Sequence, residues 1–168
     1  MNKDEETIVK EFVNEIHGSL IQVDSSLNIA SGYSVPYAFL YRFLDGKNPY
    51  VKKYQTDILV FETYQEKRIP RVIIECKISI NTDSIIAYNA KAKKHKNIFP
   101  HIQYGFLFFS DDKKELHWNY HINNDNFDFE LLLPVTNITD KQKRLFIDTI
   151  IEQVKLSREK ERIIFELK

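Results

Sequence analysis

Two carboxylates and one ammonium are spaced along two apolar segments so that they could meet at one point. Asp57 opens the segment Asp57–Phe61, and the segment Arg71–Ile80 contains Glu75 and Lys77. Both segments are rich in Ile and Val, which favours β-strands. Because side chains alternate between the two faces of a strand, Glu75 and Lys77 share one face and lie about 6–7 Å apart. If the two strands pair as a hairpin, Asp57 comes near both of them.

Side chains of these types suit chemistry with a hard divalent cation. Mg²⁺ takes one or two protein carboxylates together with waters and substrate phosphate oxygens. Such a cation polarises a phosphodiester and lowers the pKa of an attacking water, and a neighbouring lysine can orient that water or neutralise developing charge. The alternative is a solvated pair of Glu75 and Lys77 on the open face of a sheet, which is common and contributes little stability.

The order of these residues resembles the PD-(D/E)XK nuclease superfamily, whose fold is called restriction-endonuclease-like. An Asp at the start of one apolar strand is followed by Glu-x-Lys at the end of the next, then by a helix and another apolar strand, over about residues 4–110. The resemblance implies that Asp57 and Glu75 bind the metal, helped by the backbone carbonyl of Cys76. It implies that Lys77 is the catalytic lysine.

Two further polar residues are candidates for the same site. Gln55 lies two residues before Asp57, on the same strand face, and is a candidate accessory residue. In the resembled family the first helix often lends an acid to the metal site. Glu15 borders the apolar stripe of a predicted helix over 4–17 and is the candidate, with a solvated helical acid as the alternative. Thr56 stands where the family often has proline, which is a departure from its pattern.

Apolar periodicity and turn residues divide the chain into helices, strands and bends. Helices are predicted over 4–17, begun by Asp4 and ended by Gly18, over 82–97 and from 139 onward. Strands are predicted over 19–30, 57–61, 71–80, 101–109, 116–122 and 127–133, with bends at 31–34, 45–49 and 62–70. Helix and strand both remain open for 37–44 and 163–165. The expected fold is α/β, with a central mixed β-sheet flanked by α-helices, restriction-endonuclease-like, and a right-handed crossover.

Length and composition favour one soluble domain. The 168 residues are 43% hydrophobic and 29% charged, and the predicted single domain, 1–168, has a core of about 4–110 extended by C-terminal strands and a long helix over 111–168. Cys76 is the single cysteine, which excludes an internal disulfide and favours core packing in a reducing compartment. No apolar leader and no long apolar run are visible, so a cytoplasmic protein without a membrane partner is expected.

The charges are balanced overall but unevenly placed. The net charge is zero, which does not favour a nucleic-acid binder. The segment Ser84–Ser110, however, holds no acid and several lysines, and a local basic face can still bind phosphate. Lys91 and Lys94 there, with Lys67 and Arg68 in the polar bend, are the candidate DNA contacts, and the alternative for all four is a solvated surface.

The resemblance implies the function of a nuclease. It implies Mg²⁺-dependent cleavage of DNA phosphodiester bonds, with Mn²⁺ as an alternative ion and no covalent intermediate. A type II restriction enzyme or another defence nuclease, acting as a homodimer on a palindromic site, is the first expectation. A DNA repair or recombination nuclease is the second. A binding module without chemistry is the third, and in it the Asp-Glu-Lys cluster would be a structural ion pair.

Overall fold

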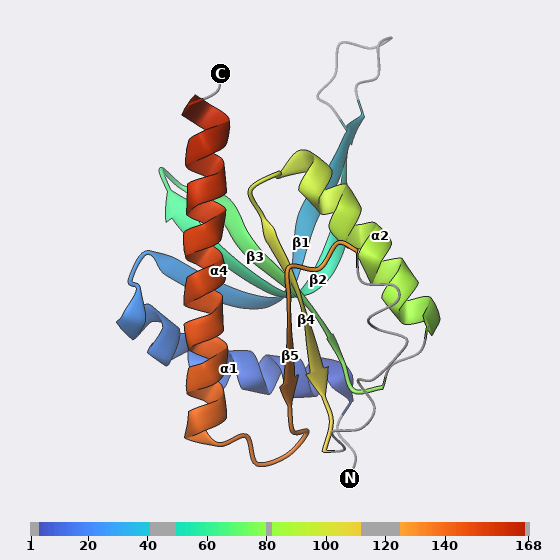
Figure 1. Ribbon diagram of the computed structural model, residues 1–168, viewed down its shortest axis with the longest axis vertical. Helices are drawn as coiled ribbons and strands as arrows, with labels where there is room; N and C mark the ends of the chain where they lie inside the picture. The colour runs from blue at the N-terminus through green and yellow to red at the C-terminus, as the bar shows by residue number, and fades with distance from the viewer. Residues whose placement is uncertain (1–3, 41–49, 80–81, 112–124, 167–168) are drawn as a thin grey trace.

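The computed structural model describes residues 4–40, 50–79, 82–111 and 125–166. Within them, five strands form one mixed sheet in the order β1-β2-β3-β4-β5 (Figure 1). The strands are β1 Leu27–Leu40, β2 Tyr50–Tyr64, β3 Lys67–Lys77, β4 Gln103–Phe109 and β5 Phe129–Leu133. The β1–β2 and β2–β3 pairs are antiparallel, and the β3–β4 and β4–β5 pairs are parallel. The predicted α/β fold with a central mixed sheet is therefore confirmed.

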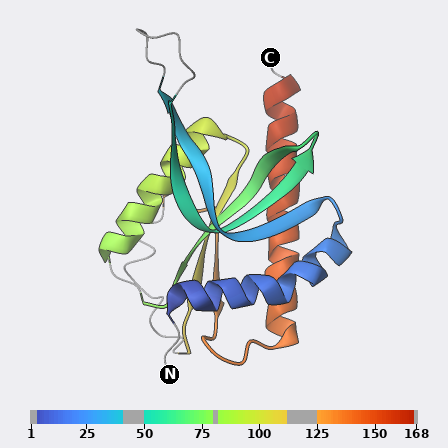
Figure 2. The same ribbon diagram turned by 180° about the vertical axis from the view of Figure 1, so that it is seen from behind.

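Helices cover both faces of this sheet. They are α1 Glu5–Val23, α2 Thr82–Ile98 and α4 Asp140–Glu166. Helices α1 and α4 share one core cluster, and Figure 2 shows α1 crossing the sheet and reaching the N-terminal half of α4. Along β3, Ile74 and Cys76 enter that cluster, whereas Ile73 packs with Ala92 of α2. Alternate side chains of β3 therefore point into cores on opposite faces.

Helix α1 extends further than the sequence predicts. Asp4 begins it as predicted, because Oδ1 of Asp4 accepts a hydrogen bond from the backbone N–H of Thr7 at 2.8 Å. The predicted end at Gly18 is wrong, since the helix continues past it and buries Leu20 in the same apolar stripe. Burying a leucine contributes more than the roughly 1 kcal/mol that a helical glycine costs, so the helix persists.

Strand β1 replaces a predicted strand and a predicted bend. The first residues of the predicted strand 19–30 belong to α1, and β1 begins only at Leu27. The bend predicted at 31–34 is wrong, since β1 continues through it while paired with β2. Gly32 has a φ of 65° at this point, a left-handed value that glycine adopts without a steric penalty.

The polar bend predicted over 62–70 is also mostly strand. Tyr64 of β2 pairs with Lys67 of β3, so only Gln65 and Glu66 form the turn, with φ of 46° and 64°. Positive φ at both central residues is typical of the two-residue turn that matches the twist of antiparallel strands. The hairpin is therefore longer than expected, and its short turn helps to fix the register between the two strands.

The remaining elements agree with the sequence wherever the structure describes them. The confirmed elements are the helix at 82–97, the strands at 101–109 and 127–133, and the long helix from 139. For 37–44 and 163–165 the sequence does not decide between helix and strand. The first of these segments is strand as far as Leu40, and the second is helix. The predicted turn at 45–49 and the predicted edge strand at 116–122 lie outside the described residues.

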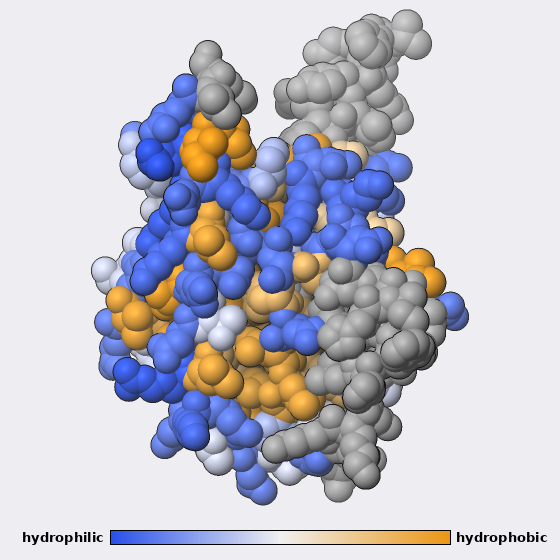
Figure 3. Space-filling model, in the orientation of Figure 1, coloured by the Kyte–Doolittle hydropathy of each residue, from blue (hydrophilic) through white to orange (hydrophobic). Residues whose placement is uncertain are grey.

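Apolar side chains also reach the surface. Figure 3 shows them gathered beside α4 and β5 on the face seen in Figure 1. The core cluster under α1 and α4 ends in partly buried side chains, namely Phe129, Leu131, Val135, Ile138 and Ile151. Among the described helices, none is long and apolar enough to cross a membrane.

Gly105 in β4 marks a close approach between neighbouring strands. It pairs with Phe129 of β5, and a Cβ at this glycine would lie 2.1 Å from Cζ of that ring. Gly105→Ala must therefore displace the ring, and we expect a loss of about 1–3 kcal/mol in unfolding free energy, measured by urea denaturation. Gly18→Ala is the matched control, because open space surrounds Gly18. An unchanged urea midpoint for Gly105→Ala would contradict this packing.

Candidate active site

The register between β2 and β3 brings Asp57 and Glu75 together. The β2–β3 ladder ends at the pair of Ile58 with Ile74, and continuing its register by one residue sets Asp57 opposite Glu75. Directly opposite residues of an antiparallel pair share a face. Leu59, two residues from Asp57, packs in the cluster under α2, so both acids face that helix. The predicted hairpin, with its two acids on one face, is confirmed.

The Asp57 carboxylate lies across the end of β3. Its Oδ2 accepts a hydrogen bond from the backbone N–H of Cys76 at 2.7 Å. Burial raises the pKa of Asp57, the bond from Cys76 opposes that rise, and the charge of Glu5 adds to it. Asp57 also borders a hollow of about 430 Å³ that Glu5, Gln55 and residues of α1 and β1 line. The carboxylate is therefore held by the backbone yet lies beside open space.

Glu75 is buried completely, with 0% of its surface exposed. Its Oε1 accepts a hydrogen bond from the Tyr104 hydroxyl at 2.6 Å, and Nζ of Lys91 lies 3.3 Å from its Oε2. Burial raises the pKa of Glu75 to about 7, Lys91 opposes the rise, and the charge of Asp57 adds to it. The alternative of a solvated pair with Lys77 is therefore wrong for Glu75, because α2 and β4 cover the carboxylate.

Lys77 lies at the end of β3 and points toward α1. Its Nζ donates to Oε1 of Glu5 at 2.5 Å and lies 5.4 Å from the centre of the Tyr88 ring. Burial alone would lower the pKa of Lys77, but the hydrogen bonds with Glu5 and Tyr88 outweigh it and the pKa is raised well above its ordinary value. Lys77 is therefore a positive charge at neutral pH, suited to orienting a water or stabilising an anion.

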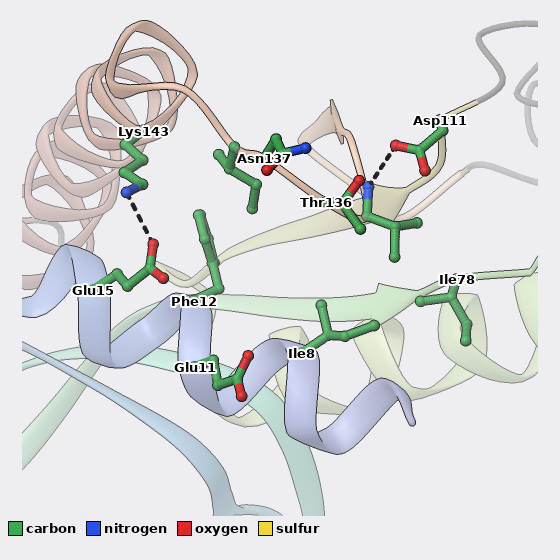
Figure 4. A pocket seen from close by; sticks show the side chains of 11 residues that line it. Ile8, Glu11, Phe12, Glu15, Ile78, Asp111, Thr136, Asn137 and Lys143 are labelled. Atoms are coloured by element: carbon green, nitrogen blue, oxygen red, sulfur yellow. Dashed lines mark hydrogen bonds and ion pairs between the residues drawn. The ribbon is translucent and has the colours of Figure 1, made fainter. Parts of the chain in front are cut away.

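The α1 acid beside the candidate site is Glu5, and Glu15 lies elsewhere. Oε2 of Glu5 accepts from the backbone N–H of Ile78 at 3.3 Å, next to Lys77. Glu15 pairs with Lys143 at 2.9 Å across a separate hollow of about 710 Å³ (Figure 4). In the sequence, Glu5 shows only as an acid in the first helical turn, which commonly serves capping and the helix dipole.

Sequence reasoning also missed two tyrosines and misplaced one lysine. Tyr104 of β4 and Tyr88 of α2 lie against Glu75 and Lys77, and no motif marked either residue. Lys91 is a candidate DNA contact in the sequence, with a solvated surface as the alternative, but its Nζ contacts Glu75 and lies 3.3 Å from the backbone oxygen of Gln55. The spacing of Tyr88 and Lys91 is a signal for this contact, because residues three apart lie on the same side of a helix. If that side of α2 faces the polar side of β3, Lys91 comes near Glu75.

The other candidate DNA contacts lie around the same face of the sheet. Nζ of Lys94 is hydrogen-bonded to the Tyr54 hydroxyl at 2.8 Å, and Lys94 is exposed. The Arg68 guanidinium lies 4.9 Å above the Tyr33 ring. Lys67 is exposed at the hairpin turn. None of these three cations is in contact with Asp57 or Glu75, and the lysines at the candidate site are Lys77 and Lys91.

The donor set at this point fits a hard divalent cation. Two carboxylates, both with raised pKa values, lie on one sheet face, and the backbone carbonyl of Cys76 is next in the chain. Within the described ranges no group of three acid, histidine or cysteine side chains could hold a metal. The two carboxylates and the backbone carbonyl are oxygen ligands of the kind that Mg²⁺ takes, and Mg²⁺ keeps several waters and needs only one or two protein carboxylates.

No protein-family model and no curated protein matches the chain. It is similar in structure to the pre-specific restriction endonuclease BsaWI in complex with DNA, with a TM-score of 0.49 and 13% identity over 89% of this chain and 60% of that chain. It is also similar to the native BbvCI A2B2 tetramer, with a TM-score of 0.44 and 12% identity over 81% of this chain and 58% of that chain. The chain thus spans 60% or less of each. With TM-scores below 0.5, these two likenesses do not indicate a function for this chain.

Proposed function

We propose that this chain is a divalent-metal-dependent endonuclease that hydrolyses phosphodiester bonds in DNA. The observation that carries the proposal is the position of Asp57 opposite Glu75 on neighbouring strands, facing the same way, with Lys77 at the end of the second strand. The PD-(D/E)XK pattern that the sequence resembles has the same residue types in the same order. The geometry of the site and the sequence pattern therefore support the same proposed function.

In this proposal, Asp57, Glu75 and the backbone carbonyl of Cys76 hold Mg²⁺ or Mn²⁺. An ion bound there would supply Lewis-acid chemistry, which polarises a phosphodiester and lowers the pKa of an attacking water. Lys77 stays protonated, because Glu5 binds its ammonium, so it orients the water or stabilises charge on the phosphate and does not act as a base. The Tyr104 hydroxyl fixes the Glu75 carboxylate. The oxygen of water forms a bond to phosphorus while the bond from phosphorus to one sugar oxygen breaks, the water gives up a proton to solvent and the leaving sugar oxygen takes one up, so no covalent intermediate forms on the protein.

The biological role follows as a further part of the proposal. A type II restriction or other defence nuclease, acting as a homodimer on palindromic DNA, is the first choice. A repair or recombination nuclease that recognises DNA structure is the second. Palindromic plasmid sites and branched or flapped oligonucleotides distinguish the two, because a restriction enzyme discriminates sequences and a structure-specific nuclease discriminates shapes.

One observation favours a different function, a binding module without chemistry. Within the described residues, the charges at the site already have protein partners, since Glu5 pairs with Lys77 and Glu75 with Lys91. Pairs of this kind can be purely structural, because a cation beside a buried carboxylate stabilises its ionised form. In that case the site would bind no metal, and the candidate DNA contacts would bind a partner instead.

A cleavage assay tests the proposed function. Supercoiled plasmid and oligonucleotide substrates are incubated with Mg²⁺, with Mn²⁺ and with a chelator, using Asp57→Asn as the matched variant. We expect nicked or linear products with either ion, none with the chelator, and none from Asp57→Asn. DNA binding without cleavage of any duplex, branched or flapped substrate would instead support the binding module.

The candidate DNA contacts make a separate prediction about salt. Lys94 and Arg68 are exposed, and the proposal makes them phosphate contacts. Lys94→Ala and Arg68→Ala should each reduce the slope of log binding constant against log salt by roughly one unit, because one fewer counterion is released. Fluorescence anisotropy with a labelled duplex and Ca²⁺ measures the slope. Lys155→Ala, on the exposed side of α4, is the control, and equal slopes for all three variants would contradict the contact assignment.

A further inference from the structure

Lys91 of α2 is the cation that contacts the buried acid. Its Nζ lies 3.3 Å from Oε2 and 3.4 Å from Oε1 of Glu75. The same atom lies 3.3 Å from the backbone oxygen of Gln55. Lys77, the lysine of the sequence pattern, is bound instead to Glu5. The two lysines therefore have different positions, and the ammonium on Glu75 comes from the helix that covers the sheet.

The surroundings of this ammonium resemble those of a bound metal ion. Two carboxylate oxygens and one backbone carbonyl face it, and hard cations take oxygen ligands of these types. The rings of Tyr88 and Tyr54 lie 4.9 and 5.8 Å away, and aromatic faces attract positive charge. A fully buried carboxyl group is accommodated either by keeping its proton or by a positive charge beside it, and Lys91 supplies that charge to Glu75 in this structure.

We propose that the Lys91 ammonium takes the place of the divalent cation on Glu75 in the metal-free protein and leaves Glu75 when that cation binds. This inference rests on the proposed function, because it takes Glu75 as a metal ligand. The two positive charges cannot share the same carboxylate oxygens, since each repels the other in a weakly polar environment. The Lys91 side chain is 24% exposed, so its flexible stem can turn the ammonium toward solvent.

A purely structural lysine would behave in the opposite way. If Lys91 only tethered α2 to β2 and β3, its loss would loosen Glu75 and weaken cation binding. If Lys91 competes with the cation, its loss removes both the competitor and a repelling charge, and cation binding tightens. The sign of the change in affinity therefore separates the two roles.

Calorimetric titration with Ca²⁺, without DNA, tests the inference. We expect Lys91→Met and Lys91→Gln to bind Ca²⁺ about tenfold more tightly than the parent protein, because the competing ammonium is gone. Lys93→Met is the matched control, since Lys93 is exposed on the same helix, and it should bind like the parent. Lys91→Gln keeps a donor for the Gln55 carbonyl and serves if the methionine variant does not fold.

Thermal melts give a second readout that does not depend on calorimetric heat. Without Ca²⁺, Lys91→Met should melt below the parent, because Glu75 has lost its compensating charge, and added Ca²⁺ should raise its melting temperature more than that of the parent. Equal or weaker Ca²⁺ binding by both Lys91 variants, with clear binding by the parent, would overturn this role and leave the proposed function standing. No Ca²⁺ binding by the parent in either measurement would overturn both.

Discussion

Lys77→Ala is expected to slow DNA cleavage about 100-fold or more, the usual effect of removing one preorganised electrostatic group. Lys77 is not a ligand in the proposed site, because its ammonium is bound to Glu5 at 2.5 Å. Its loss should therefore leave cation binding nearly intact and act on the chemical step. Single-turnover cleavage and Ca²⁺ calorimetry measure these two quantities separately.

Glu75→Gln is the companion variant and should fail in a different way. Glutamine is chosen instead of alanine because Glu75 is completely buried, and alanine would leave a cavity. The amide has nearly the same shape and can still accept the hydrogen bond from the Tyr104 hydroxyl. The variant should lose Ca²⁺ affinity as well as cleavage. If both variants melt normally and cut DNA at the parent rate, the site is not catalytic and the binding module is the better assignment.

The second large effect concerns stability and pH, and Glu75 is again the group involved. Burial raises the pKa of Glu75 from its ordinary 4.5 to about 7, so the folded state holds this proton more tightly than the unfolded state. The stabilisation is fully present below about pH 4.5 and is lost as pH rises to about 7. The loss is about 3 kcal/mol, because one pKa unit corresponds to about 1.4 kcal/mol. Glu75→Gln does not titrate and keeps its stability.

Urea unfolding of the metal-free parent and of Glu75→Gln at several pH values measures this difference. The stability of the variant relative to the parent should increase from about pH 5 to about pH 8 by up to about 3 kcal/mol. Mg²⁺ should narrow the gap at the higher pH, because it stabilises the parent by binding the ionised carboxylate. Parallel pH curves for the two proteins would show that Glu75 does not carry a raised pKa in the folded state.

The central hairpin and the shared face of its acids can be predicted from residue types alone. Strand side chains alternate with a period of two, so the apolar residues around Asp57 and Glu75 decide which face each acid takes. A register slip of one residue would have moved a row of Ile and Val side chains out of the core. Burial energy therefore fixed the relation between the two acids locally, and the structure confirms it.

At the boundaries of α1 and β1, side-chain burial and strand pairing outweigh the propensities of single residues. Gly18 is a helix-ending residue by propensity, but Leu20 gains more by joining the core in the same helix. The sequence predicts a bend that includes Gly32, but Gly32 lies within a strand because pairing with β2 continues on both sides of it. Propensity differences are about 1 kcal/mol per residue, and burial of one large side chain exceeds them.

The sequence by itself determined the hairpin, the face that Asp57 and Glu75 share, and the helix that follows them. Only the tertiary structure decided that Glu75 is fully buried, that Lys91 contacts it, and that Glu5 binds Lys77. The reason is physical. Periodicity gives the apolar face of a helix, but which end of that helix meets the end of a strand depends on its docking angle and on contacts between residues far apart in the chain. A lysine beside the apolar face of a helix can therefore lie on the protein surface or contact a buried acid. The docking of the helix on the sheet decides between these two positions.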